Sequence, residues 1–219
     1  ANTVYTLRWT ISNPPCANST DDVVITLRSN PTAANAGPDQ AVCATSVTLA
    51  GNAPTVGTGL WTIVSGAGGT VATPSSPTST FSGAANTVYT LRWTTSNAPC
   101  ANSTDDVVIT LRSNPTAANA GPDQTVCATS VTLAGNAPTV GTGLWTIVSG
   151  AGGTVATPTS PTSAFSGTAN TVYTLRWTTS NAPCANSTDD VVVTLTGNPT
   201  TANAGSDQTL CGTSTTLFG

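Results

Sequence analysis

The sequence repeats itself at one constant spacing along its whole length. Three sets of large or reactive residues recur at this spacing, namely Cys16, Cys100 and Cys184, then Cys43, Cys127 and Cys211, then Trp9, Trp93 and Trp177. Aligning residues 33–116 with residues 117–200 leaves seven differences, so 77 of 84 positions are identical. The period is longer than that of solenoid repeats and fits one small independent domain. We therefore expect a row of near-identical domains, arranged like beads on a string.

The period divides the chain into four parts. Residues 33–116 and 117–200 are two complete repeats, whereas residues 1–32 correspond to the end of a preceding repeat and residues 201–219 to the start of a following one. Joined together, the two end parts would lack the segment equivalent to residues 52–84 and could not close a core. Since the sequence has neither an initiator Met nor an export signal, we interpret it as part of a longer array.

The composition favours strands and turns over helices. The chain has 46 Thr and 21 Ser, which prefer strands and turns, and it lacks the strong helix formers Lys, Glu and Met. Seven short β-type runs separated by turn residues recur in each repeat, and in the first complete repeat they are Gln40–Cys43, Ser46–Gly51, Gly59–Ser65, Thr70–Thr73, Thr78–Ser82, Thr87–Ser96 and Asp106–Arg112. This pattern predicts an all-β fold of tandem seven-stranded Greek-key sandwiches.

The core of each sandwich is expected to be aromatic. In the strongest strand, Tyr89, Leu91 and Trp93 alternate with Val88, Thr90 and Arg92, so one face is apolar and the other is mostly polar. Trp61 and Phe81 complete the set of large residues. We interpret these aromatic groups as packing residues rather than as a sugar-binding platform.

Composition also excludes several functions. No apolar stretch reaches the length of about 18 residues that a membrane-spanning helix needs. The formal charge is −4 and the five cations are isolated arginines, so we expect no nucleic-acid partner. The chain has no His, and its Asp-Asp dipeptide recurs in every repeat without a cleft-forming insertion, so we expect no enzymatic activity.

The cysteines predict a disulfide framework in an oxidising compartment, because there are two per repeat and no His to complete a zinc site. The favoured pairing is Cys43 with Cys100 inside one repeat, which would close a long loop and add about 4 kcal/mol. In a standard sandwich, however, these two turns lie at opposite poles, beyond the limit of about 7 Å between α-carbons. The alternatives are a bond from Cys43 to Cys184 of the next repeat, or free thiols. Cys127 is in the position of Cys43, and Cys16 and Cys211 would need partners outside this sequence.

Two further groups of residues are candidate sites. Asp105 and Asp106, with Asp123 beside the next repeat junction, could bind Ca²⁺ through their oxygens. Adjacent strand residues point to opposite faces, however, so we favour a solvated strand start or a cross-strand pair of Arg92 with Asp106. The Asn-Ser-Thr triplets match the N-glycan acceptor rule at Asn18, Asn102 and Asn186, and exposed Thr and Ser are alternative sites for O-linked sugars.

A combination of motifs resembles bacterial tandem Ig-like or PKD-like surface repeats. The motifs are Asn119–Cys127, Gly143–Trp145, Ser160–Ser163, Tyr173–Trp177 and Cys184–Thr194. The resemblance implies an Ig-like β-sandwich spacer in a large secreted adhesin or filament, a place outside the cell or on its surface, and calcium in some relatives. The chain departs from the PKD pattern Trp-Asp-Phe-Gly-Asp-Gly, since it has Trp145-Thr-Ile-Val-Ser-Gly150 instead.

Two functions follow from these observations. The first is a structural repeat of an extracellular bacterial filament or surface stalk, with neighbouring repeats of the same chain and identical chains as partners. The second is an adhesin module that binds carbohydrate or a cell-surface partner. The substitutions between repeats are small, for example Ser75/Thr159 and Ala84/Thr168, and none adds an aromatic group. This conservatism favours the structural role, because binding loops would be expected to vary.

Overall fold

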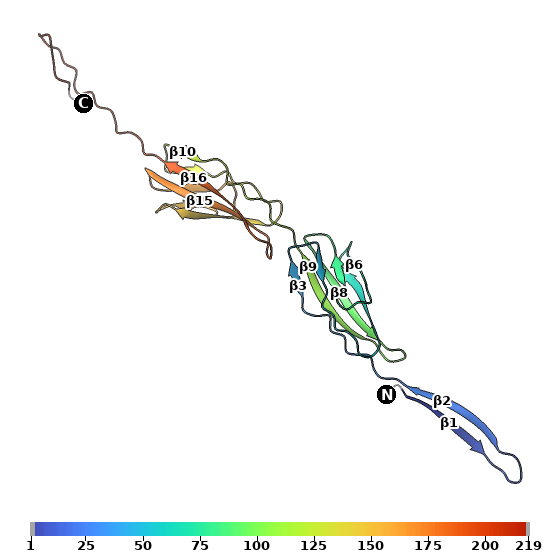
Figure 1. Cartoon of the computed structure of the whole chain (residues 1–219). Helices are drawn as coiled ribbons and strands as arrows, with labels where there is room; N and C mark the ends of the chain where they lie inside the picture. Colours follow the sequence, from blue (N-terminus) through green and yellow to red (C-terminus); the bar gives the residue numbers. More distant parts are fainter. Residues whose placement is uncertain (1–2, 218–219) are drawn as a thin grey trace. The chain divides into compact units, whose positions relative to one another are not determined.

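The computed structural model describes residues 3–217, and those residues form strands and loops without a helix. They make up two compact units (Figure 1). The first unit contains the chain up to Asn114 together with Asn181–Ala185, and the second contains Pro115–Ser180 and the chain from Asn186 onward. The division between Asn114 and Pro115 differs slightly from the sequence period, whose boundaries at residues 33 and 117 stay a prediction.

The first complete repeat contains seven strands. They are β3 (Gln40–Val42), β4 (Ser46–Thr48), β5 (Thr58–Ser65), β6 (Thr70–Val71), β7 (Thr80–Ser82), β8 (Thr87–Ser96) and β9 (Ser103–Leu111). All seven lie within or near the runs expected from the sequence. The last begins at Ser103 rather than at Asp106, because its pairing with β8 continues to the Thr95↔Ser103 position.

These strands form two sheets, with the orders β3-β9-β8-β5 and β4-β7-β6. The first strand, β3, pairs in parallel with the last strand, β9, and the other pairs are antiparallel. The first, third, sixth and seventh strands therefore share one sheet, and the second, fourth and fifth share the other. The Ig fold divides its second to seventh strands in this way, so the prediction of Ig-like Greek-key sandwiches is confirmed.

One core joins the two sheets of the repeat. Trp61 of β5, Tyr89 and Trp93 of β8, and Phe81 of β7 are each at most 2% exposed. The ring centroids of Trp61 and Trp93 lie 5.0 Å apart, and those of Phe81 and Tyr89 lie 4.9 Å apart in an edge-to-face arrangement. Such aromatic pairs add about 0.5–1.5 kcal/mol beyond the burial of their surfaces. The predicted packing role of these aromatic residues is confirmed.

The second complete repeat has the same architecture. Its strands are β10 (Gln124–Val126), β11 (Ser130–Thr132), β12 (Thr142–Ser149), β13 (Thr154–Val155), β14 (Ala164–Ser166), β15 (Thr171–Ser180) and β16 (Ser187–Leu195). The sheets have the orders β10-β16-β15-β12 and β11-β14-β13. Its core holds the same large residues as the first, namely Trp145, Phe165, Tyr173 and Trp177.

The two ends of the chain contain parts of this architecture. Near the N-terminus, β1 (Thr3–Ile11) and β2 (Ser19–Leu27) form an antiparallel hairpin in the same register as β8 and β9. Its aromatic face is open, since Trp9 is 74% exposed whereas the equivalent Trp93 is fully buried. Residues 201–217 form no strand, but Gly205 N donates to Asn203 Oδ1, as Gly37 N does to Asn35 Oδ1 in the first complete repeat.

Candidate functional site

A disulfide joins Cys43, which directly follows β3, to Cys184, in the loop between β15 and β16. The two α-carbons lie 5.0 Å apart, within the usual range for this bond, although the cysteines are 141 positions apart in the sequence. The loop segment Asn181–Ala185 belongs to the first compact unit. A loop that is part of the second repeat by sequence is thus covalently tied to the body of the first repeat.

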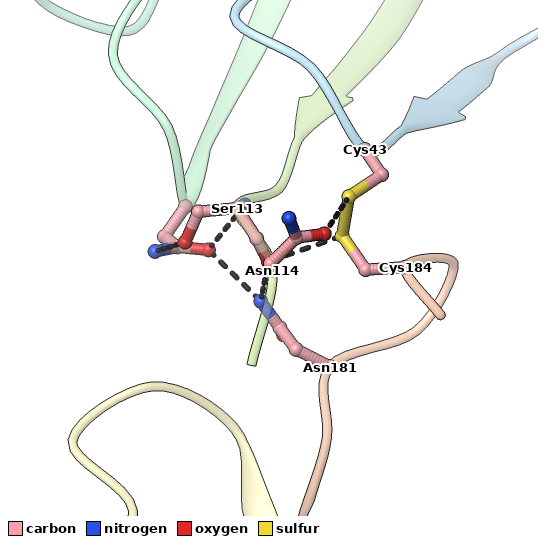
Figure 2. The surroundings of a disulfide bond; sticks show 6 residues. Cys43, Ser113, Asn114, Asn181 and Cys184 are labelled. Atoms are coloured by element: carbon pink, nitrogen blue, oxygen red, sulfur yellow. Dashed lines mark hydrogen bonds between the residues drawn. A yellow bond between two sulfur atoms is a disulfide. The ribbon is translucent and has the colours of Figure 1, made fainter. Parts of the chain in front are cut away.

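The loop is also held by hydrogen bonds from Asn181 (Figure 2). Its Nδ2 donates to the carbonyl oxygen of Ser113 at 2.8 Å and to Oδ1 of Asn86 at 3.1 Å. Asn86 in turn donates to Ser113 Oγ at 2.9 Å and accepts from Ser113 N at 3.2 Å. The backbone of Asn86 has a φ of 57°, a left-handed conformation that Asn tolerates better than most residues. Asn86 therefore connects the loop to the end of the first repeat.

Two polar atoms of the first repeat lie close to the disulfide. The carbonyl oxygen of Ser113 lies 3.0 Å from Sγ of Cys184, and Oδ1 of Asn114 lies 3.2 Å from Sγ of Cys43 (Figure 2). Cys184 is only 7% exposed. We call Asn181–Cys184 the cysteine loop, and we call the residues of the first repeat that receive it, Cys43, Asn86, Ser113 and Asn114, the junction seat.

The favoured expectation, a bond between Cys43 and Cys100, is wrong. Because β3 runs parallel to β9 with Val42 opposite Leu111, Cys43 lies beside the end of β9. Cys100 precedes the start of β9 at Ser103. The nine residues of β9 extend roughly 30 Å at about 3.3 Å per residue, far beyond the reach of a disulfide. The alternative left open by the sequence, Cys43 with Cys184, is the pairing that the structure forms.

Among the described residues, the remaining four cysteines are free, and two of them lie in equivalents of this junction. The Sγ of Cys100 donates to the carbonyl oxygen of Ser29 at 3.2 Å, and Asn97 Nδ2 donates to the same oxygen at 2.8 Å. These contacts match those of Cys184 and Asn181 with Ser113, which lies one period after Ser29. The Sγ of Cys127 donates to Asn198 Oδ1 at 3.1 Å, as expected from the equivalence of Asn198 with Asn114. Cys16 and Cys211 are exposed.

A hollow of about 370 Å³ opens beside Cys127 in the second unit. Its lining includes Thr129, Ala169, Thr196, Gly197 and Asn198. Gly197 and Asn198 are the equivalents of Ser113 and Asn114, so the hollow coincides with the second repeat's equivalent of the junction seat.

Sequence reasoning missed Asn86 and Asn181. The signal that could have found the second is its spacing, since an Asn stands three residues before each cysteine of one set, at Asn13, Asn97 and Asn181. In all three loops the backbone N–H of the cysteine donates to the carbonyl oxygen of this Asn. The motif is thus a recurring turn that presents an amide and a sulfur together.

The two aspartates of each Asp-Asp dipeptide have different structural roles. Asp106 pairs with Arg92 across β8 and β9, with Nε donating to Oδ1 at 2.7 Å and Nη2 to Oδ2 at 2.8 Å. Hydrogen bonding by Arg92 lowers the pKa of Asp106 below 3.8, and the same cause lowers the pKa of Asp22 and Asp190 beside Arg8 and Arg176. The favoured alternative to calcium at Asp106, a cross-strand pair, is therefore present.

The other candidate calcium ligands accept backbone hydrogen bonds. Asp105 Oδ2 accepts from Ala36 N at 2.7 Å, and Asp123 Oδ1 accepts from Val192 N at 2.8 Å. Within residues 3–217, the structure brings together no group of three or more metal-ligating side chains. These contacts explain the three aspartates without an ion, and calcium binding stays a prediction.

The candidate glycosylation sites Asn18, Asn102 and Asn186 all have exposed side chains. Each directly precedes a strand, at β2, β9 or β16. This position leaves the amide accessible, and glycosylation itself stays a prediction. No helix in the described part of the chain is long and apolar enough to cross a membrane.

No protein-family model matches the sequence, and no curated protein matches it. Three solved structures that resemble the chain are the insect immune protein hemolin, the complex of Dpr2 Ig1-Ig2 with DIP-Theta Ig1-Ig3, and human CDH23 EC21-23. Hemolin is 12% identical with a TM-score of 0.45, over 87% of this chain and 56% of its own. The Dpr2 complex is 15% identical with a TM-score of 0.40, over 88% and 73%. CDH23 is 10% identical with a TM-score of 0.34, over 87% and 73%. The chain therefore spans little more than half of hemolin.

Proposed function

We propose that the chain is a structural repeat of an extracellular filament or surface stalk, of the bacterial Ig-like or PKD-like kind that its motifs resemble. The observation that carries this proposal is the Cys43–Cys184 disulfide. A bond that ties a loop of one repeat to the body of the preceding repeat keeps consecutive repeats connected even when the segment between them is stretched. Such a bond limits how far the chain between the two cysteines can be extended, which suits a load-bearing role and has no evident use in a catalytic one.

The segment between the repeats supports the same role. Pro115 and Pro122 flank the start of the second repeat, and the ring of each proline fixes its own backbone angle φ. The residue before each proline is restricted to extended conformations, so the segment is stiffer than a Gly- and Ser-rich linker. The disulfide and the two prolines thus both restrain the chain between the two repeats.

The proposed location is outside the cell. Disulfides persist in oxidising surroundings, such as the cell exterior, and are rare in the cytosol. The Cys43–Cys184 bond is consistent with an extracellular protein of this kind.

Immunolabelling of the native source tests the proposal. Antibodies raised against the whole chain are expected to decorate threads along their entire length, with roughly 4 nm per repeat, since a strand of ten residues plus its turns extends about 35–45 Å. Antibody absorbed with the purified chain is the control. Labelling confined to thread tips, or to compact particles that carry a ligand, would replace this proposal with the adhesin alternative.

We also propose that glycans cover part of the surface at Asn18, Asn102 and Asn186. Their exposure and their place before strand starts support this, and a sugar coat would protect edge strands that have no Lys to discourage pairing. Mass spectrometry of the segment from its native source tests the idea, since a mass equal to the bare 21.7 kDa would exclude it. Variants with Asn replaced by Gln identify the modified positions.

A further inference from the structure

We propose that the junction seat selects which cysteines pair, with Asn181 as the positioning residue that holds Cys184 beside Cys43 before the bond between them forms. The Cys43–Cys184 disulfide is then the last step of folding rather than its starting point. This inference goes beyond the proposed function, because it concerns how the observed bond is made and is independent of what the repeats build together.

Chain proximity alone would favour other bonds. Cys43 and Cys184 are 141 positions apart in the sequence. Three other pairs are each only 27 positions apart, namely Cys16–Cys43, Cys100–Cys127 and Cys184–Cys211. The entropic cost of closing a flexible loop grows with the logarithm of its length, so an unfolded chain would close each short pair roughly tenfold more often than the observed pair. The folded structure must therefore select the bond.

The hydrogen bonds that seat the cysteine loop form without a disulfide in the equivalent loop that carries Cys100. Asn97 Nδ2 donates to the carbonyl oxygen of Ser29 at 2.8 Å, the distance at which Asn181 Nδ2 donates to Ser113. The thiol of Cys100 donates to the same oxygen of Ser29 at 3.2 Å. Whatever Cys100 bonds to in a longer chain, these contacts do not require a sulfur–sulfur bond, so they can precede it.

The two cysteines are positioned by neighbouring parts of the first repeat. Cys43 directly follows β3, whose place is fixed by its pairing with β9. Ser113, two residues after the end of β9, offers the carbonyl oxygen that accepts from Asn181. The strand that fixes one cysteine and the atom that receives the loop of the other thus lie at the same end of β9. Such positioning raises the effective concentration of one thiol at the other, which offsets the cost of closing the long loop.

The order of the covalent steps follows from exposure. Cys43 is exposed, whereas Cys184 is only 7% exposed. With oxidised glutathione as the oxidant, the Cys43 thiolate attacks one glutathione sulfur and releases one glutathione thiolate. The Cys184 thiolate then attacks the Cys43 sulfur of this mixed disulfide and releases the second glutathione thiolate. The two protein thiols lose two protons and two electrons in total, and the oxidant becomes two molecules of glutathione.

The experiment follows oxidation of the reduced full chain in a glutathione redox buffer, with samples trapped by iodoacetamide. Cleavage after the arginines puts Cys43 and Cys184 on different peptides, and fragmentation distinguishes Cys184 from Cys211, so mass spectrometry quantifies each pair. In native buffer we expect Cys43–Cys184 to be the main bond within one chain. In concentrated urea, we expect each pair 27 positions apart to exceed it roughly tenfold.

The positioning role is tested by Asn181→Asp, which keeps the size of the side chain but removes the amide donor. Because two hydrogen bonds are lost, we expect the equilibrium constant of the Cys43–Cys184 bond against glutathione to fall about tenfold. The matched control Asn97→Asp makes the same change in the equivalent loop and is expected to leave this constant unchanged. A merely structural role of Asn181 would lower the stability of the reduced chain without changing which cysteines pair.

A second measurement tests the seat without altering Asn181. In Cys43→Ser the bond cannot form, and we expect iodoacetamide to alkylate the seated Cys184 more slowly than the exposed Cys16. Addition of Asn181→Asp to this variant is expected to remove the protection of Cys184.

Several results would overturn the inference. These are an unchanged equilibrium constant in Asn181→Asp, an equal fall in Asn97→Asp, a Cys43–Cys184 bond that still predominates in urea, or equal alkylation of Cys184 and Cys16 in Cys43→Ser. Circular dichroism of each reduced variant establishes that it is folded. None of these results changes the labelling expected of native threads, so this inference and the proposed function fail separately.

Discussion

Gly59 in β5 leaves room for the Trp93 ring in the aromatic core because it has no side chain. A Cβ at this position would overlap Cζ2 of the Trp93 ring. We expect Gly59→Ala to destabilise the first unit by about 1–3 kcal/mol, because the rigid ring cannot move without disturbing the packed core. Urea unfolding followed by tryptophan fluorescence measures the change. The control Gly212→Ala, whose Cβ would meet its nearest atom at 4.0 Å, is expected to have no effect, and equal stability of both variants would contradict the prediction.

The ion pair of Arg92 with Asp106 predicts how the stability of the fold changes with pH. Hydrogen bonding by Arg92 holds the pKa of Asp106 in the folded protein below its ordinary value of 3.8. A depressed folded-state pKa stabilises the fold above the unfolded-state pKa, and the contribution is lost as the pH falls through the folded-state value. Asp106→Asn is therefore expected to lower stability at neutral pH, by a small amount because the pair is exposed, and to make no difference in strong acid.

A carbon NMR titration of the Asp106 carboxyl group checks the cause. The midpoint is expected below 3.8 in the unmodified chain and closer to that value in Arg92→Gln. A midpoint that does not respond to this substitution would show that the pair has no influence on the carboxylate.

At the scale of strands, β1 and β8 allow the same sequence to be compared in two different structural environments. Residues 3–10 and 87–94 have the same sequence, so their intrinsic hydrogen-exchange rates are matched. The strand β8 lies between β9 and β5 with a buried face, whereas within residues 3–217 β1 pairs with β2 alone and has an open face. Isolated two-stranded hairpins are marginally stable in water. We expect amides of β1 to exchange roughly a thousandfold faster or more, because opening energies range from about 0 for fraying segments to the global value.

Hydrogen-exchange mass spectrometry in dilute, reducing solution measures this difference. Equal protection of the two strands would show that the hairpin is as stable as the sandwich and would contradict this prediction.

The same strands show what the sequence could and could not predict. The alternation of Tyr89, Leu91 and Trp93 sufficed to predict β8 and its buried face, because the period of a strand is set by its own residues. The pairing of Cys43 was not accessible, since it depends on which end of β9 the short strand β3 joins. Three residues of β3 carry no signal for a parallel register with β9. The role of Asn86 could not be predicted either, because no distinctive motif beside it signals the left-handed backbone that places it at the junction seat.

For the whole molecule, the disulfide determines how much chain a pulling force can extract. Force applied to the two ends passes through the Cys43–Cys184 bond and bypasses the chain between them, since the cysteines are 141 positions apart. At about 3.3–3.6 Å per extended residue, we expect full unfolding of the oxidised chain to release roughly 50 nm less length than unfolding of the reduced chain. Single-molecule force spectroscopy measures this difference. Cys43→Ser is expected to behave as the reduced chain does in either condition, and Cys100→Ser to behave as the unmodified chain does. Equal released lengths before and after reduction would show that the bond carries no load, and the disulfide could then no longer support a structural role for the repeats.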